Sequence, residues 1–128
     1  MTIVSVASFE GESEVLDRAS LDKLAQLDPS GQSRLVERVL STYQGSLSRL
    51  RQQIADGCAG TDAAALRMGA HTLKSSSASI GALQLSRLCA QVEQAIREGR
   101  SEELPALVAQ LQREAERVDV AVRRLMAV

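Results

Sequence analysis

Hydrophobic and polar residues alternate along most of this chain with the spacing of amphipathic helices. Between about residues 29 and 55, apolar residues lie three or four positions apart, at Leu35, Val39, Tyr43, Leu47, Leu50 and Ile54. This spacing puts them on one face of a helix. The pattern recurs over about residues 62–80, 83–98 and 102–127. The sequence therefore predicts four long helices, each with one apolar face.

Residues that favour helix ends and turns separate these segments. A short leading helix is expected to begin at Ser20 and to direct Leu21, Leu24 and Leu27 inward. Other caps and stops are expected at Asp28 with Pro29 in the first turn, Thr61, Gly81, Gly99 and Ser101.

Short connections between one-sided helices predict an all-α fold, an antiparallel up-down-up-down four-helix bundle with a short additional N-terminal helix. The bundle is assigned to residues 19–128, and residues 1–18 are interpreted as a tail or linker, because they include "FEGESE" and lack helical periodicity. Composition agrees, since 128 residues suit one domain and aromatic residues make up only 2%.

Charge and cysteine content exclude several classes of function. The net charge is −1 with no basic stripe, which argues against nucleic-acid binding. Cys58 and Cys89 indicate reduced thiols, and a single histidine rules out a His/Cys zinc cluster. No apolar run approaches the roughly 18 residues of a membrane span. We therefore expect a cytoplasmic domain without membrane contact.

The one histidine, His71, lies in "AHTLKSSSASIGA", from Ala70 to Ala82. A helix turns by about 100° per residue, so Leu66, Leu73 and Ile80 share one face and His71 lies opposite them. The same layout places four residues beside the imidazole, at three or four positions along the helix: Arg67, Met68, Lys74 and Ser75. The imidazole should project into solvent next to a cation.

An exposed imidazole can act as a nucleophile and accept a phosphoryl group. Lys74 is a compact charge that suits a phosphoryl anion, whereas Ser76 and Ser77 turn inward, where small side chains let helices approach. No carboxylate is expected on the same face as His71, so the remaining catalytic groups should arrive on another protein.

These residues resemble a known family. "AHTLKSSSASIGA", followed by "LSRLCAQVE", is similar to the motif of histidine-containing phosphotransfer (HPt) domains, which reads His-x-Leu-Lys-Gly-Ser-Ser, then Gly-Ala, then a Leu…Cys…Glu run. The matching positions are His71, Leu73, Lys74, Ser76, Ser77, Gly81, Ala82, Cys89 and Glu93. Ser75 departs from the family pattern, which has glycine there; the serine should be tolerated with an altered transfer rate or partner preference.

The resemblance implies a phosphorelay carrier rather than an enzyme. His71 would accept a phosphoryl group, on Nε2, from the aspartyl phosphate of a receiver domain and pass it to another receiver. Lys74 would neutralise the phosphoryl charge. The receiver would supply the aspartate and Mg²⁺, so no cofactor is expected in this chain, which is expected to be a monomer. The segment "VLDRASLDKLAQLDP" also resembles the start of HPt modules at the C-terminus of hybrid sensor kinases.

The docking surface for a receiver is predicted around His71. It comprises Arg67, Met68, Lys74, Ser75 and Ala78, joined by Gln84 and Arg87 on the next helix. A dimerising phosphoacceptor module of a sensor kinase fits less well, since Thr72 stands where that family has an acid. The histidine domain of chemotaxis kinases is closer, but the Cys89 region fits the relay type better. An adaptor bundle that binds partners without phosphorylation stays open.

Overall fold

The computed structural model describes residues 15–127 of the chain. The elements are α2 (Arg18–Gln26), α3 (Leu35–Ala59), α4 (Ala63–Ser79), α5 (Leu83–Arg97), a 3₁₀ turn η1 (Ser101–Glu103) and α6 (Leu104–Ala127). The described residues contain no strand, and none of their helices is long and apolar enough to cross a membrane.

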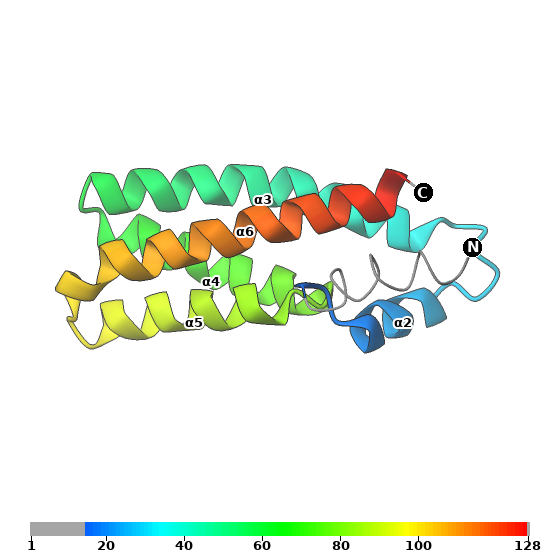
Figure 1. Ribbon diagram of the computed structural model, residues 1–128, viewed down its shortest axis with the longest axis horizontal. Coiled ribbons are helices and arrows are strands. Elements are labelled where there is room, and N and C mark those ends of the chain that lie inside the picture. Colours follow the sequence, from blue (N-terminus) through cyan, green and yellow to red (C-terminus); the bar gives the residue numbers. More distant parts are fainter. Residues whose placement is uncertain (1–14, 128) are drawn as a thin grey trace.

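The four long helices pack as a bundle, which confirms the predicted fold class (Figure 1). Each packs against the next along the chain, and α6 also packs against α3 and closes the ring. Leucine, isoleucine and valine side chains fill the centre, among them Leu47, Ile54, Leu73, Leu85, Leu111 and Val118. The cyclic order puts the α4–α5 seam on the side of the bundle opposite the α3–α6 seam.

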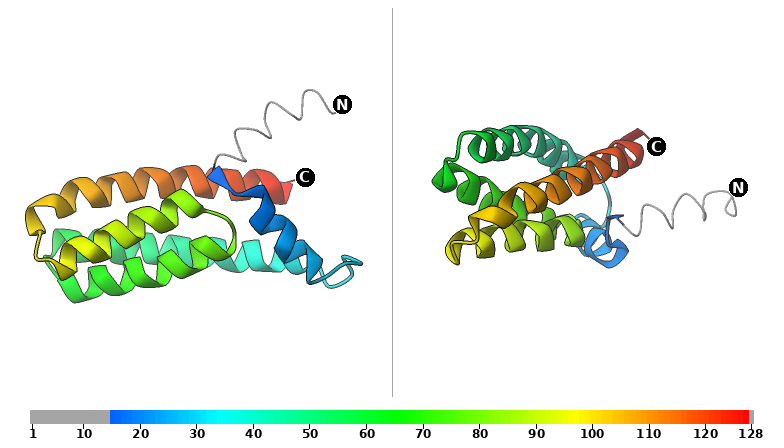
Figure 2. Two further views of the ribbon diagram at one scale, coloured as in Figure 1. Left: turned by 90° about the horizontal axis from the view of Figure 1, so that it is seen from below. Right: turned by 60° about the vertical axis from the view of Figure 1, so that its left-hand side comes forward.

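The short helix α2 covers one end of this bundle. Helices α3 and α6 have 25 and 24 residues, whereas α4 and α5 have 17 and 15. At 1.5 Å per residue, the longer pair extends roughly 12 Å further. Helix α2 lies at that end, beside the α4–α5 turn and inclined to the long helices (Figure 2). Its Leu21 packs against the core, as do Val15 and Leu16, which precede the helix.

The start of α2 differs from the sequence prediction. Asp17, not Ser20, is the N-cap, and its carboxylate accepts hydrogen bonds from the backbone N–H of Ser20 at 3.0 Å and from Ser20 Oγ at 2.7 Å. Leu21 packs partly against the core, but Leu27 is 75% exposed, so its predicted inward orientation is wrong. Residues 1–14 of the predicted tail lie outside the described residues, and Leu16, also in that tail, is buried in the core.

Helix α3 begins later than predicted. Residues 28–34 form turns, because Gly31 and Arg34 have φ of 73° and 53°, which a right-handed helix does not allow. Asp28 still caps α3, but from a distance along the chain: its carboxylate accepts a hydrogen bond from Leu35 N–H at 3.2 Å. Pro29 is therefore in the connection rather than in the first turn.

The other helix ends show how packing overrides local signals. Helix α3 continues through Gly57 to Ala59. A Cβ at Gly57 would lie 2.9 Å from the backbone nitrogen of Leu66. This glycine allows α3 and α4 to approach closely. The N-cap of α4 is Asp62 rather than Thr61, and Ser101 lies in the 3₁₀ turn rather than capping α6.

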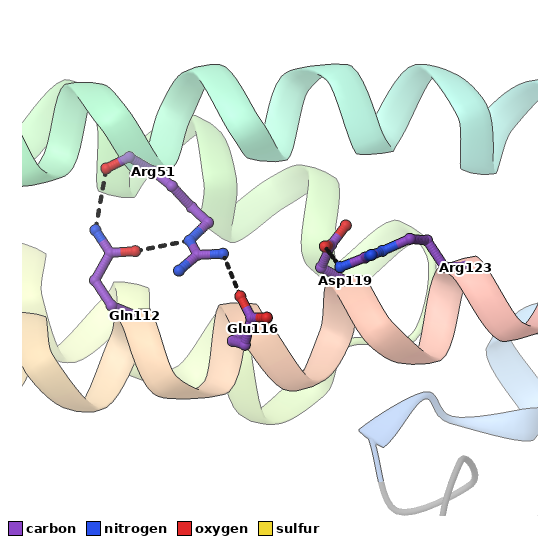
Figure 3. Close-up of polar contacts among 5 residues, drawn as sticks. All are labelled: Arg51, Gln112, Glu116, Asp119 and Arg123. Carbon is purple, nitrogen blue, oxygen red and sulfur yellow. Dashed lines mark hydrogen bonds and ion pairs between the residues drawn. The ribbon is translucent and has the colours of Figure 1, made fainter.

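A polar cluster joins α3 to α6 (Figure 3). Arg51 Nε donates to Gln112 Oε1 at 2.9 Å, and Gln112 Nε2 donates back to the Arg51 carbonyl at 3.0 Å. Arg51 Nη1 also pairs with Glu116 at 3.0 Å, and Asp119 pairs with Arg123 one turn further along α6. The contacts of Arg51 join the two longest helices along their seam, whereas the Asp119–Arg123 pair lies within α6.

The turn between α4 and α5 is built on Gly81. Its φ is +85°, and a Cβ there would lie 2.8 Å from the carbonyl oxygen of Asp17. Asp17 N–H donates to the Gly81 carbonyl at 2.7 Å. The predicted helix end at Gly81 is confirmed, and its glycine is required both by the left-handed conformation and by the chain that crosses it.

Replacing Gly81 with alanine should therefore destabilise the fold. The expected loss in the free energy of unfolding is about 2 kcal/mol, from left-handed strain plus the contact with Asp17. Gly99→Ala is the matched control, because its φ is +70° but nothing lies within 4 Å of a Cβ there. It should lose about 1 kcal/mol. Urea denaturation measures both, and equal losses would contradict the role assigned to the Asp17 crossing.

Candidate functional site

His71 lies on the outer face of α4, at the seam with α5. Its side chain is 63% exposed, whereas Leu66, Ala70 and Leu73 of the same helix are buried in the core. The prediction that the imidazole projects away from the core is confirmed. The helical period alone accounts for this, since the apolar face of α4 is required by the bundle.

The expectation that no carboxylate lies near His71 is wrong. Glu93 of α5 reaches across the seam, and its Oε2 lies 2.9 Å from His71 Nδ1. The Glu93 side chain is only 5% exposed, so this carboxylate sits beneath the imidazole rather than beside it in solvent. The helical layout of α4 could not reveal a contact that comes from a neighbouring helix.

The contact with Glu93 determines which nitrogen of the imidazole carries hydrogen. An ionised carboxylate can only accept hydrogen bonds, so Nδ1 of His71 must be the donor. In a neutral imidazole, the lone pair is then on Nε2. The side chain is therefore held with a nucleophilic nitrogen on the part of the ring that Glu93 does not occupy.

Lys74 completes a three-residue cluster. Its Nζ lies 2.6 Å from Oε1 of Glu93 in an ion pair, while Oε2 faces His71. Ser86 of α5 donates a hydrogen bond to the Lys74 carbonyl at 3.0 Å and fixes the two helices here. Burial alone would raise the pKa of Glu93, but its contacts with Lys74 and then His71 outweigh burial and lower that pKa. Glu93 is thus an anion at neutral pH.

The surroundings beneath this cluster are buried and uncharged. Burial, reinforced by the Glu93 charge, raises the pKa of Cys89 to about 12, so the thiol is neutral. The hydroxyls of Tyr43 and Ser77 share a buried hydrogen bond of 2.8 Å, and burial also raises the pKa of Tyr43. The predicted inward position of Ser77 is confirmed; Ser76 is half-buried and bonds to its own helix backbone.

Apart from the half-buried Lys74, the residues predicted to form the docking surface are exposed. On α4 these are Arg67, Met68, Ser75 and Ala78; on α5 they are Gln84 and Arg87, which are joined by a hydrogen bond of 3.1 Å. The structure adds the end of α2, where Leu24 and Leu27 line a shallow hollow with Ala78. Sequence reasoning missed this extension because it assigned Leu27 to the core.

Sequence reasoning also missed Glu93 as a site residue, although a signal was present. Glu93 follows Val92 directly and lies one turn from both Cys89 and Ile96, at the edge of the apolar face of α5. An acid at the edge of an apolar face must find a cation or a donor on the helix that covers it. That requirement points to α4, which presents His71 and Lys74.

The site contains one nucleophile, one cation and one buried anion. Among residues 15–127, no three His, Cys, Asp or Glu side chains are grouped so as to hold a metal ion. The cluster can hold an imidazole in one tautomer and present it, with a positive charge nearby, to a group brought by another molecule. This chemistry suits a carrier of an anionic group.

Comparisons with known proteins agree with this chemistry. The family model described as "Hpt domain" matches residues 34–121, which are more than half of the chain and include α3, α4, α5 and most of α6. A search of curated proteins finds no match. Among solved structures, the chain is similar to histidine-containing phosphotransfer protein B (HptB) from Pseudomonas aeruginosa PAO1, with 26% identity and a TM-score of 0.79. The alignment covers 88% of this chain and 95% of HptB.

These matches do not favour the alternative of an adaptor bundle without phosphotransfer. They also agree with the separate observation of a single, exposed, hydrogen-bonded histidine. The chain belongs to the Hpt domain family, and it is a histidine phosphotransfer carrier of phosphorelays rather than a classical enzyme.

Proposed function

We propose that His71 is the residue that accepts and donates the phosphoryl group, and that it does so through Nε2. The observation that supports this most directly is the hydrogen bond between His71 Nδ1 and the buried Glu93 carboxylate. This contact occupies one ring nitrogen and leaves the lone pair on the other. Exposure of the side chain gives an incoming protein access to that nitrogen.

The transfer is an exchange of one bond at phosphorus. The Nε2 lone pair attacks the phosphorus of a receiver's aspartyl phosphate; a P–N bond forms, the acyl P–O bond breaks, and the aspartate leaves as a carboxylate. The reverse reaction passes the group to a second receiver. The receiver supplies the aspartate and Mg²⁺, so the chemistry is completed by the partner.

Lys74 stabilises the transferring group by charge. Its ammonium lies on the same face as the imidazole and is held there by Glu93 Oε1 at 2.6 Å. A cation placed before the reaction needs no rearrangement when negative charge approaches. The ion pair with Glu93 therefore keeps Lys74 near the path of the phosphoryl group.

The receiver binds to a docking face, made of the exposed residues around His71 together with the end of α2. The described large hydrophobic residues that are exposed are Leu27 at 75%, Met68 at 62% and Leu83 at 38%. Met68 is one turn before His71, and Leu27 lines the hollow beside Ala78, two turns after it. Exposed apolar residues on both sides of a reactive residue are typical of a surface that binds another protein.

Ser75 lies within the docking face, where the family pattern has glycine, and it is exposed. Its side chain therefore adds volume where a receiver approaches, rather than disturbing the core. We expect this serine to alter transfer rate or partner preference. We also propose that the domain is a monomer, because the described residues of one chain form both the site and the core. A cytoplasmic location is part of the same proposal.

His71→Gln should abolish phosphorylation while leaving the fold intact, since the side chain is exposed. The assay incubates the protein with a labelled phospho-receiver and Mg²⁺ and measures acid-labile label on the chain. Wild type should take up label and the variant should take up none. Label on the variant would show that another residue is the acceptor.

Lys74→Ala should slow transfer about tenfold, the size expected from losing one charge-assisted contact to the phosphoryl group. The same substitution leaves the buried Glu93 with one cation contact fewer, so a thermal melt must show that the variant is folded. Arg113→Ala, an exposed cation on α6, is the control for loss of charge. An unchanged rate in folded Lys74→Ala would reject the electrostatic role.

Met68→Ser should weaken receiver binding about tenfold, because an apolar contact at the interface is lost. Stability should be unchanged, because the side chain is exposed in the free protein. Isothermal calorimetry with a receiver measures the affinity, and Gln110→Ser on the exposed face of α6 is the control. Equal affinities for the two variants would remove Met68 from the docking face.

A further inference from the structure

Glu93 is one of two buried glutamates in the described residues, and the two are held in different ways. Glu114 accepts a hydrogen bond from Arg117, an exposed residue on its own helix, at 3.0 Å. Glu93 makes both of its contacts on a different helix, with the proposed phosphoryl acceptor and its cation. Burial of a carboxylate is costly, so its position under the imidazole calls for a chemical reason.

We infer that Glu93 keeps the proton on Nδ1 of His71 while the phosphoryl group is bound to Nε2, so that the ring leaves phosphorus as neutral imidazole. This inference rests on the proposed function of His71. It assigns Glu93 as a positioning residue that acts through the imidazole and does not contact the phosphoryl group.

The charge balance of the transfer explains why this proton matters. Neutral imidazole attacks through Nε2 and becomes a phosphorylated ring with one positive charge, with the Nδ1 hydrogen retained throughout. In the reverse step, the P–N bond breaks and its electron pair returns to Nε2, which restores neutral imidazole. If Nδ1 had lost its proton, the leaving group would be the far more basic imidazolate anion, and P–N cleavage would be slow.

A buried carboxylate is the group best suited to hold this proton. The Oε2–Nδ1 distance of 2.9 Å allows a hydrogen bond between a cationic ring and an anion, which is stronger than one to a neutral acceptor. Burial strengthens the interaction, because little water competes at the carboxylate. A glutamine at this position could accept the same hydrogen bond, but it would provide no charge to balance the ring.

The other groups around His71 do not replace this function. On α4, Arg67 and Lys74 are cations and would disfavour a positive ring. On α5, Cys89 is a neutral thiol. Helix α3 packs against α4 near Gly69, where its Gln53 is uncharged. Among residues 15–127, Glu93 is thus the acid that contacts the imidazole.

The test follows loss of the phosphoryl group from His71 without requiring a receiver. The full chain is phosphorylated with phosphoramidate, a small-molecule phosphoryl donor, and loss of phosphohistidine to water is followed by phosphorus NMR from neutral to alkaline pH. Three proteins are compared: wild type, Glu93→Gln and the matched control Glu114→Gln. Nitrogen NMR of the imidazole reports at each pH whether Nδ1 carries hydrogen.

We expect wild type and Glu114→Gln to retain the hydrogen on Nδ1 at pH values at which Glu93→Gln has lost it. Their rate of phosphoryl loss should therefore stay constant to a higher pH than that of Glu93→Gln. In the alkaline range, loss from Glu93→Gln should be about tenfold slower, which corresponds to exchanging a charged for a neutral hydrogen-bond acceptor. Thermal melts verify that all three are folded. If Glu93 had only a structural role, Glu93→Gln would change the thermal melt but not the pH profile of phosphoryl loss.

Coinciding pH profiles for wild type and folded Glu93→Gln would overturn the inference. If Glu93→Gln is unfolded, Glu93→Asp is tested instead, because it retains the charge at a greater distance from Nδ1. Its pH profile should then be intermediate, and a profile equal to that of wild type would overturn the inference. Failure of phosphoramidate to modify His71 in wild type would reject the inference together with the proposed function. If phosphorylated wild type shows the expected pH profile but transfers its phosphoryl group to no receiver, the result would count against the relay role alone.

Discussion

The turn at Gly81 is the constraint on which the site depends. It brings α5 back along α4 in one register, with the crossing chain at Asp17 pressed against the glycine. In that register Glu93 meets both His71 and Lys74, at 2.9 and 2.6 Å. A shift of one residue along α5 would rotate Glu93 by about 100° and remove it from the seam. The backbone geometry of this tight turn therefore determines how the imidazole of His71 is oriented.

The site also shows how a charge can be buried at acceptable cost. Moving a carboxylate out of water is unfavourable, and an isolated buried glutamate would be protonated rather than charged. Here an ion pair with Lys74 and a hydrogen bond from His71 outweigh that cost, and the pKa of Glu93 is lowered. The ion pair and the hydrogen bond that offset this cost also hold Lys74 and His71 in position, and these two side chains face the partner in the proposed function. Stability and reactivity are therefore linked through a single side chain.

The remainder of the bundle holds this arrangement rigid and presents it. Leucine and valine side chains fill the centre, and the Arg51–Gln112–Glu116 contacts join the long helices on the opposite seam. Helix α2 lies at the end of the bundle and contributes Leu27 to the proposed docking face. One half of the proposed reaction is thus built into the scaffold, while in that proposal the aspartate and metal ion come from the partner.

The sequence by itself determined the helices, their apolar faces and the outward position of His71, because these follow from a period of 3.6 residues within one segment. It also placed Gly81 at a helix end. It could not determine that Leu27 is exposed, that α3 begins after residue 34, or that Glu93 lies under the imidazole. Those features depend on which helices become neighbours and in what register. Only the tertiary structure decides this, because it brings together residues that are 22 positions apart in the chain, as His71 and Glu93 are.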